Sequence, residues 1–250
     1  MIRSLQAILN ADLQATDGPI GRCSDFLFDD KHWTVRYMVA DTGKWLPGLR
    51  VLISPSAIFD WDWKTDQIPV RLTREDIQNS PSLASDMPVS RQYEQQLVDQ
   101  YGWIPYWHGP HVWGPVTTPF SKADIQVKPI ESIESAGKSH LRSVKEVAGY
   151  HVEATDGSAG RVDDFLLDHD VWAIRYLVVD TRKWLSGRKV LISPTWARRI
   201  DWKRSQLHVR MNRGAIENSP VFDREHGPTR DDELALFKHY DMQPYWLNVE

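Results

Sequence analysis

Short apolar stretches alternate with turn residues along the chain, which is the pattern of a small β domain. Phe26–Phe28 predicts a strand that ends at a polar turn, and Trp33–Ala40 predicts the longest strand. Val51–Ile53 and Ile68–Leu72 predict two more strands of alternating character. This stretch of the chain therefore supplies about five short strands.

Two helices are expected after these strands. Thr73 is followed three residues later by Asp76, a capping box that opens a short helix ending near Asn79. Ser90 is expected to cap a second helix that runs to Tyr101. A closed barrel removes the exposed edges that such short strands would otherwise leave. We therefore expect a mainly β fold, a small β-barrel followed by short C-terminal helices.

The same sequence pattern occurs twice in the chain. Ala15–Gly18 returns as Ala154–Gly157, at an offset of 139 residues, and this offset aligns residues 1–107 with residues 140–246 without a gap. The sequence thus predicts a tandem duplication of one domain, repeat 1 over residues 1–107 and repeat 2 over residues 140–246. In each repeat an Asp-Gly pair predicts a turn whose glycine needs positive φ.

A Pro- and Gly-containing linker, residues 108–139, joins the two repeats. It has no sustained hydrophobic period, so we expect it to be mostly irregular. Trp113 and Phe120 are apolar enough to dock on a domain surface. A linker of this length also allows the two repeats to pack as an intramolecular pseudo-dimer.

Composition and charge limit the class of protein and the cellular compartment that we expect. The 250 residues are an ordinary globular mixture with a net charge of −4, which lacks the broad positive field of a general nucleic-acid binder. Cys23 is the only cysteine, so no disulfide can form within the chain, and a reducing cytosol suits it. No apolar run has the length of a membrane span, and the first residues show no signal peptide. We expect a cytoplasmic protein.

Several motifs recur at fixed places in each repeat. In repeat 1 they are Ala15-Thr16-Asp17-Gly18-x-x-Gly21, Asp25-Phe26, Trp33-x-x-Arg36-Tyr37, Trp45-Leu46-x-Gly48 and Val51-Leu52-Ile53-Ser54-Pro55. With these motifs the chain resembles the PRC-barrel family, named after the cytoplasmic domain of the photosynthetic reaction centre H subunit. Pro88–Glu94 is similar to a segment of a bacterial branch of that family. The resemblance implies a compact β-barrel used for binding and regulation, without catalytic residues.

Residues with catalytic or metal-binding chemistry are few. Asp29-Asp30 and Asp163-Asp164 are paired carboxylates, and the first pair lies where a turn favours aspartate. Arg36 precedes Asp41 by five residues on the longest strand, and we expect the two to form an ion pair. No zinc spacing, nucleophile elbow or phosphate-binding loop occurs in the sequence. We expect no enzyme activity, no cofactor and no metal site.

Tryptophan and charge distribution mark a candidate interaction surface. The chain has 12 Trp, of which some do not recur at the offset of 139, and these either complete the core or form an interface. Repeat 1 carries a net charge of −4 and repeat 2 a net charge of +1, so a basic face in repeat 2 is either solvated or binds an acidic partner. The candidate surface residues are Trp61, Trp103, Trp107, Trp196, Arg198, Arg199, Lys203, Arg204 and Trp246.

Three functions fit this sequence. The first is a non-enzymatic binding, scaffold or regulatory protein that contacts another protein. The second is an RNA- or ribosome-associated factor that uses the basic face of repeat 2. The third is a regulator at a photosynthetic or other membrane electron-transfer complex, an analogy with the family alone.

Overall fold

The computed structural model describes residues 2–43, 45–58, 61–62, 64–83, 89–119, 139–181, 188–224 and 226–247. The chain divides into two compact units. We call Ile8–Val144 with Asp170–Ala173 the repeat-1 unit, and Met1–Ala7 with Lys145–His169 and Ile174–Glu250 the repeat-2 unit. Phe120 and most of the expected linker lie outside the described residues.

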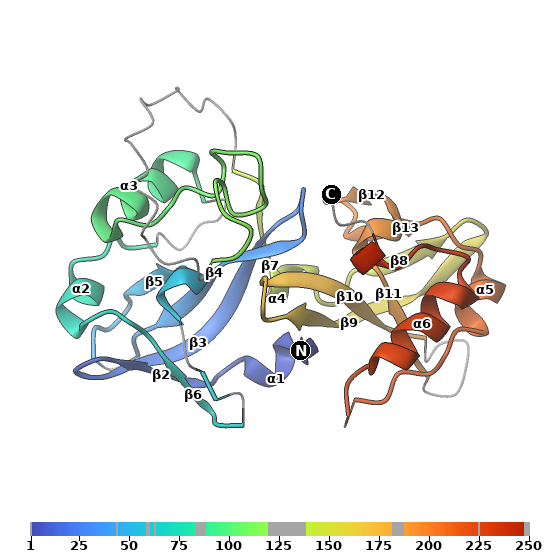
Figure 1. Ribbon diagram of the computed structural model, residues 1–250, viewed down its shortest axis with the longest axis horizontal. Helices are drawn as coiled ribbons and strands as arrows, with labels where there is room; N and C mark the ends of the chain where they lie inside the picture. The colour runs from blue at the N-terminus through green and yellow to red at the C-terminus, as the bar shows by residue number, and fades with distance from the viewer. Residues whose placement is uncertain are drawn as a thin grey trace. The chain divides into compact units, whose positions relative to one another are not determined.

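The repeat-1 unit contains a mainly antiparallel sheet (Figure 1). Its strands are β2 (Asp12–Ala15), β3 (Gly18–Asp29), β4 (Thr34–Asp41), β5 (Arg50–Ile53), β6 (Gln67–Pro69) and β7 (Leu141–Ser143). The sheet runs β5-β4-β3-β2-β6, and β7 pairs with the far end of β3. Only the β2–β6 pair is parallel among these strand pairs of the described chain.

The repeat-2 unit has the same strand arrangement with one further strand, β12, at its edge. Its strands are β1 (Ile2–Ser4), β8 (His151–Ala154), β9 (Gly157–Asp168), β10 (Ala173–Asp180), β11 (Lys189–Ile192), β12 (Ala197–Asp201) and β13 (Gln206–Val209). The sheet runs β11-β10-β9-β8-β13-β12, and β1 pairs with the far end of β9. The prediction of a mainly β fold is therefore confirmed.

The two repeats exchange their first strands. β1 begins repeat 1, yet it pairs with β9 of repeat 2, with Arg3 opposite Leu167. β7 begins repeat 2, yet it pairs with β3 of repeat 1. The hydroxyl of Ser4 donates to Asp164 Oδ2 at 2.6 Å, and Ser143 donates to Asp25 in the same way. The compact units therefore do not follow the boundaries of the sequence repeats.

The closed barrels expected from the sequence are not found among the described strands, because the strand order of each unit has two ends. An irregular segment instead bonds to one edge strand of each unit, β5 or β11. The N–H of Leu83 donates to the carbonyl of Arg50 on β5, and the N–H of Phe222 donates to the carbonyl of Lys189 on β11. Covering an edge with a loop protects it as closure would.

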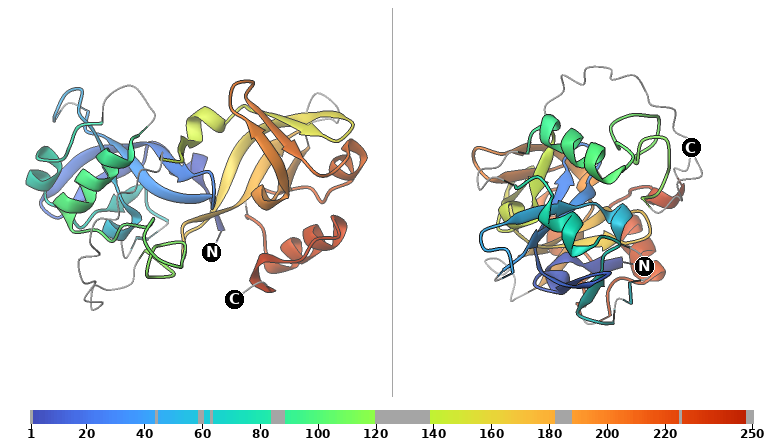
Figure 2. Two further views of the ribbon diagram at one scale, coloured as in Figure 1. Left: turned by 90° about the horizontal axis from the view of Figure 1, so that it is seen from above. Right: turned by 90° about the vertical axis from the view of Figure 1, so that its left-hand side faces the viewer.

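Helices follow the strands in each unit, as expected. In the repeat-1 unit they are α2 (Arg74–Gln78) and α3 (Arg91–Tyr101), and Figure 2 shows α3 beside the strands. Thr73 forms the predicted capping box with Asp76, and Ser90 caps α3 by accepting from the N–H of Tyr93. The remaining helices are α1 (Leu5–Ile8), α4 (Val144–Val147), α5 (Arg213–Glu217) and α6 (Arg230–His239), with single turns at η1 (Pro55–Ala57), η2 (Pro194–Trp196) and η3 (Tyr245–Leu247).

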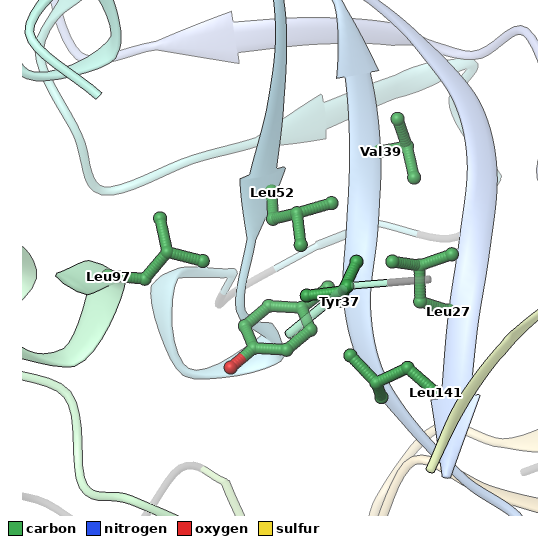
Figure 3. Close-up of a cluster of buried hydrophobic side chains, with 7 residues drawn as sticks. Leu27, Tyr37, Val39, Leu52, Leu97 and Leu141 are labelled. Carbon is green, nitrogen blue, oxygen red and sulfur yellow. The ribbon is translucent and has the colours of Figure 1, made fainter. Parts of the chain in front are cut away.

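A cluster of buried side chains forms the core between β3, β4, β5 and α3 (Figure 3). Tyr37 and Leu52 come from the sheet, Leu97 comes from α3, and Leu141 comes from the exchanged strand β7. Part of the repeat-1 core is therefore built from the first residues of repeat 2. The predicted turn glycines, Gly18 and Gly157, have φ of +149° and +136°, which confirms the expected backbone.

Candidate binding site

A set of interacting polar side chains recurs in both units at the offset of 139. In the repeat-1 unit it comprises Asp29, Arg36, Arg91, Glu94 and Tyr106. In the repeat-2 unit its members are Asp168, Arg175, Arg230, Glu233 and Tyr245. We call each set an arginine site, because one strand arginine lies at its centre.

The β3–β4 hairpin positions Arg36. Asp29 is the register partner of Thr34, and Arg36 lies two residues further on the same face of β4, so its long side chain reaches back to the carboxylate. Nη2 of Arg36 donates to Asp29 Oδ2 at 3.0 Å, and the Arg36 side chain is fully buried. The expected ion pair with Asp41 is wrong, because Asp41 lies at the opposite end of β4.

Charge and burial oppose each other at Asp29. Burial alone would raise the pKa of this carboxyl, but the hydrogen bond from His32 and the charge of Arg36 outweigh it and hold the pKa below its ordinary value. The N–H of Lys31 also donates to Asp29 at 2.8 Å, so the carboxylate completes the turn as well as the ion pair. Burial lowers the pKa of Arg36, and the neighbouring Asp29 opposes that effect. The pair therefore stays ionised at neutral pH.

The end of repeat 1 covers the other side of Arg36. The ring of Tyr106 lies 3.9 Å from Arg36 Cζ, a stacked cation–π contact. The Tyr106 hydroxyl donates to Glu94 Oε1 at 2.7 Å, and Arg91 Nη1 lies 2.9 Å from Glu94 Oε2. Burial and the adjacent Glu94 raise the pKa of Tyr106 far above its ordinary value, so its hydroxyl is a neutral donor. Trp107 in turn stacks on Arg91 at 4.2 Å.

The segment that follows repeat 1 docks on this site. Nη1 of Arg36 donates to the carbonyl of Val112 at 2.6 Å, and the ring of Trp113 lies 4.8 Å from Arg36 Cζ. Trp113 is buried, and its Nε1–H donates to the carbonyl of Val171 at 3.0 Å. A tight turn at Gly114 (φ +75°) shapes the segment. The strand arginine thus holds a piece of irregular polypeptide through one carbonyl and one tryptophan.

The arginine site of the repeat-2 unit keeps the internal contacts. Nε and Nη2 of Arg175 both donate to Asp168 Oδ2, at 3.1 and 2.9 Å, and the Tyr245 ring stacks on Arg175 at 4.0 Å. Tyr245 also donates to Glu233 Oε1 at 3.1 Å. Burial and the charge of Glu233 raise the pKa of Tyr245 to about 12. Within the described part of the chain, Nη1 of Arg175 has no hydrogen-bond acceptor.

The four carboxylates of the two arginine sites are already paired with donors of the protein. A general base needs a carboxylate that can accept a proton from a substrate. Here Asp29, Glu94, Asp168 and Glu233 all accept from arginine or tyrosine donors of their own site. Among the residues that the structure describes, no group of three His, Cys, Asp or Glu side chains could hold a metal ion.

The candidate surface residues from the sequence fall in three environments. Trp196 is buried against Phe237 and Tyr240 and offers no surface. Trp103 stacks on Tyr101 beside the repeat-1 core, and Trp61 is half-buried. The remaining residues reach the surface at least in part; Trp107 and Trp246 are half-buried, and Arg198, Arg199, Lys203 and Arg204 are exposed.

The central residues of both arginine sites were missed as binding residues in the sequence. Two signals could have found them. Arg36 interrupts an otherwise apolar stretch on β4, and each polar member of the site recurs at the offset of 139. A charged residue that occurs in both copies of a mostly apolar strand indicates that each copy has an oppositely charged partner within its own fold.

No family model matches this chain, and no curated protein matches it. No helix in the described part of the chain is long and apolar enough to span a membrane.

Proposed function

We propose that this protein is a non-catalytic binding protein, built from two PRC-barrel-like repeats, that recognises polypeptide segments of a partner protein. The observation that supports this function is the docking of Val112 and Trp113 on Arg36. This contact supports the proposal, because the segment held by Arg36 belongs to neither the sheet nor the helices of the unit.

The contacts with this segment are those of a protein–protein interface. A hydrogen bond from a charged donor contributes about 1.5–3 kcal/mol, and a desolvated cation–π contact about 2 kcal/mol. Tryptophan and arginine are also the residues that dominate binding energy at interfaces. Both occur together here, in a site whose arginine is already fixed by Asp29.

The strand exchange supports the proposal of an intramolecular pair of repeats. Because β1 completes the repeat-2 sheet and β7 completes the repeat-1 sheet, each repeat depends on the other for one strand. Covalent linkage makes this exchange efficient, since it gives the exchanged strand a high effective concentration. A paired arrangement presents two arginine sites in one chain.

Selection from a library of displayed random peptides tests this function. The full chain is immobilised, and enrichment is compared with that on the same chain denatured in urea. We expect the folded chain to enrich peptides that share a motif, while the denatured chain does not. If the folded chain enriches no motif, the proposal of polypeptide binding is wrong.

A second candidate function is binding of RNA by the β12–β13 hairpin. Arg198 and Arg199 on β12 and Lys203 and Arg204 in the following turn are all exposed, and Arg199 has only a weak pairing with Asp201, at 3.9 Å. Binding of single-stranded RNA through these cations would weaken steeply as salt rises. Replacing the four cations by glutamine should then abolish RNA binding in a filter assay, and affinity that is independent of salt would exclude this function.

A further inference from the structure

The two arginine sites differ in how much of them is covered. The side chain of Arg36 is 0% exposed, whereas that of Arg175 is 24% exposed. The second arginine of each site shows the same difference in exposure. The side chain of Arg91 is 14% exposed, and that of Arg230 is 56% exposed. Both sites keep the arginine–aspartate ion pair, the stacked tyrosine and the tyrosine–glutamate hydrogen bond, and they differ in what covers them.

The cover of the repeat-1 site is the segment that follows Trp107. This segment supplies the carbonyl that accepts from Nη1 of Arg36 and the Trp113 ring beside the guanidinium. The repeat-2 site differs in this contact, and the side chain of Arg175 stays partly exposed. Nη1 of Arg175 thus remains a donor without an acceptor among the described residues.

We propose that the arginine site of repeat 2 binds a segment of a partner protein that carries a tryptophan preceded by a residue with a free backbone carbonyl. The carbonyl accepts from Nη1 of Arg175, and the indole packs beside the guanidinium. The occupant follows from the template within the chain, because Val112 and Trp113 make these two contacts with the equivalent arginine. This inference rests on the proposed polypeptide-binding function and assigns it to one site and one kind of ligand.

Local charge favours a neutral carbonyl and an aromatic ring over an anion. Asp168 neutralises Arg175, and Glu233 neutralises Arg230 at 3.0 Å. A phosphate or carboxylate would therefore meet as much negative as positive charge at this site. A guanidinium that already donates two hydrogen bonds still attracts an aromatic face and a carbonyl oxygen.

The site is also preorganised. Two hydrogen bonds to Asp168 and the stacked Tyr245 ring fix the plane of the Arg175 guanidinium before any ligand binds. The neighbouring Trp246 ring is held by Arg230, whose Cζ lies 3.9 Å from the ring centroid, and by Tyr245. Binding then costs little side-chain entropy on the side of this protein.

A synthetic peptide with the sequence of residues 108–119 tests the inference directly. It is titrated to millimolar concentration into the isotope-labelled full chain, in which the chain's own segment already covers the repeat-1 site. We expect saturable shifts of the NMR signals of the Arg175 Nε–H and the Trp246 indole. A second peptide with alanine in place of Trp113 should bind at least tenfold more weakly.

Two protein variants test whether the peptide binds at Arg175. Arg175→Lys keeps a cation beside Asp168 but loses the planar stack, and we expect at least tenfold weaker binding. Arg199→Gln, an exposed arginine on β12 of the same unit, is the matched control and should bind the peptide normally. The backbone spectrum of each variant shows whether it is folded.

Three outcomes would overturn the inference, namely no shift at Arg175 and Trp246, equal binding of both peptides, or normal binding by folded Arg175→Lys. Peptides enriched by display that bind equally well to Arg175→Lys would leave polypeptide binding in place and move it to another site. The absence of any enriched peptide would instead reject the proposed function itself. Failure of the site and failure of the function are therefore distinguishable.

Discussion

Replacing Leu5 by alanine should destabilise the sheet of repeat 2, although Leu5 belongs to repeat 1 in the sequence. Leu5 directly follows β1, is fully buried, and belongs to the repeat-2 unit. The neighbouring Gln6 N–H donates to Asp164 Oδ1 at 3.1 Å, which anchors this stretch beside β9. The effect should therefore appear in β9 before it appears in β3.

The magnitude follows from the burial of Leu5. The substitution removes three buried carbon atoms, at about 0.8 kcal/mol each, which is about 2.4 kcal/mol of lost transfer free energy. The cavity left behind brings the total loss to about 2–5 kcal/mol. A loss of 2 kcal/mol in the free energy of local opening corresponds to amide exchange that is about 30-fold faster.

Hydrogen–deuterium exchange with mass spectrometry measures the effect in each strand. We expect faster exchange in peptides that cover Gly157–Asp168, with little change in those that cover Gly18–Asp29. Val144 occupies the position equivalent to Leu5 and is buried in the repeat-1 unit. Val144→Ala is therefore the matched control, and it should accelerate exchange in β3.

The reverse pattern would refute the strand exchange. If Leu5→Ala accelerates exchange in β3 and spares β9, each repeat keeps its own first strand. A pair of cysteines gives an independent readout if the alanine variant unfolds. Cysteines at Arg3 and Leu167, which are register partners, should form a disulfide, whereas cysteines at Arg3 and Phe28 should not.

Three further substitutions test the local physics. Gly160→Ala places a Cβ 2.4 Å from a backbone carbonyl oxygen at φ +139°. In Gly157→Ala only backbone strain acts, which costs about 1–3 kcal/mol. Urea unfolding should therefore show a larger loss of stability for Gly160→Ala, and equal losses would refute the close approach. Burial raises the pKa of Asp164, so the folded state binds a proton more tightly than the unfolded chain, and stability falls as pH rises from 3.8 through the raised pKa. Asp164→Asn lacks this titration, so its stability relative to the unsubstituted protein should increase over that range, and a constant difference would contradict the burial argument. Tyr106→Phe removes the hydroxyl donor of the buried Glu94 and should lower the free energy of unfolding by about 1–3 kcal/mol, whereas unchanged stability would show that the bond contributes nothing.

Local structure was largely determined by the sequence itself. The offset of 139 predicted two copies of one fold, and the helix caps lie where the patterns placed them. The prediction that Trp33–Ala40 is the longest strand was wrong, because β3 has 12 residues and β4 has 8. Thr73 and Ser90 cap their helices as expected because a capping bond joins residues only three apart. The exposure of Arg198 and Arg199 likewise follows from their charge.

Tertiary structure decided every pairing between distant residues. Arg36 pairs with Asp29 because the register of a hairpin, and not distance along one strand, brings two side chains together. Trp196 is buried because α6 packs over it through Phe237 and Tyr240, which lie about 40 residues further along the chain. In both cases the residues adjacent in sequence to Arg36 or Trp196 do not indicate which distant residue it contacts.

The strand exchange is the clearest case of this division. β1 and β7 have nearly the same sequence, Ile2-Arg3-Ser4 and Leu141-Arg142-Ser143, yet β1 pairs with β9 and β7 pairs with β3. Local propensity is equal for the two pairings, so the sequence determines that a first strand exists and not which sheet receives it. The choice depends on the path of the chain in the folded protein, which is a property of the whole molecule.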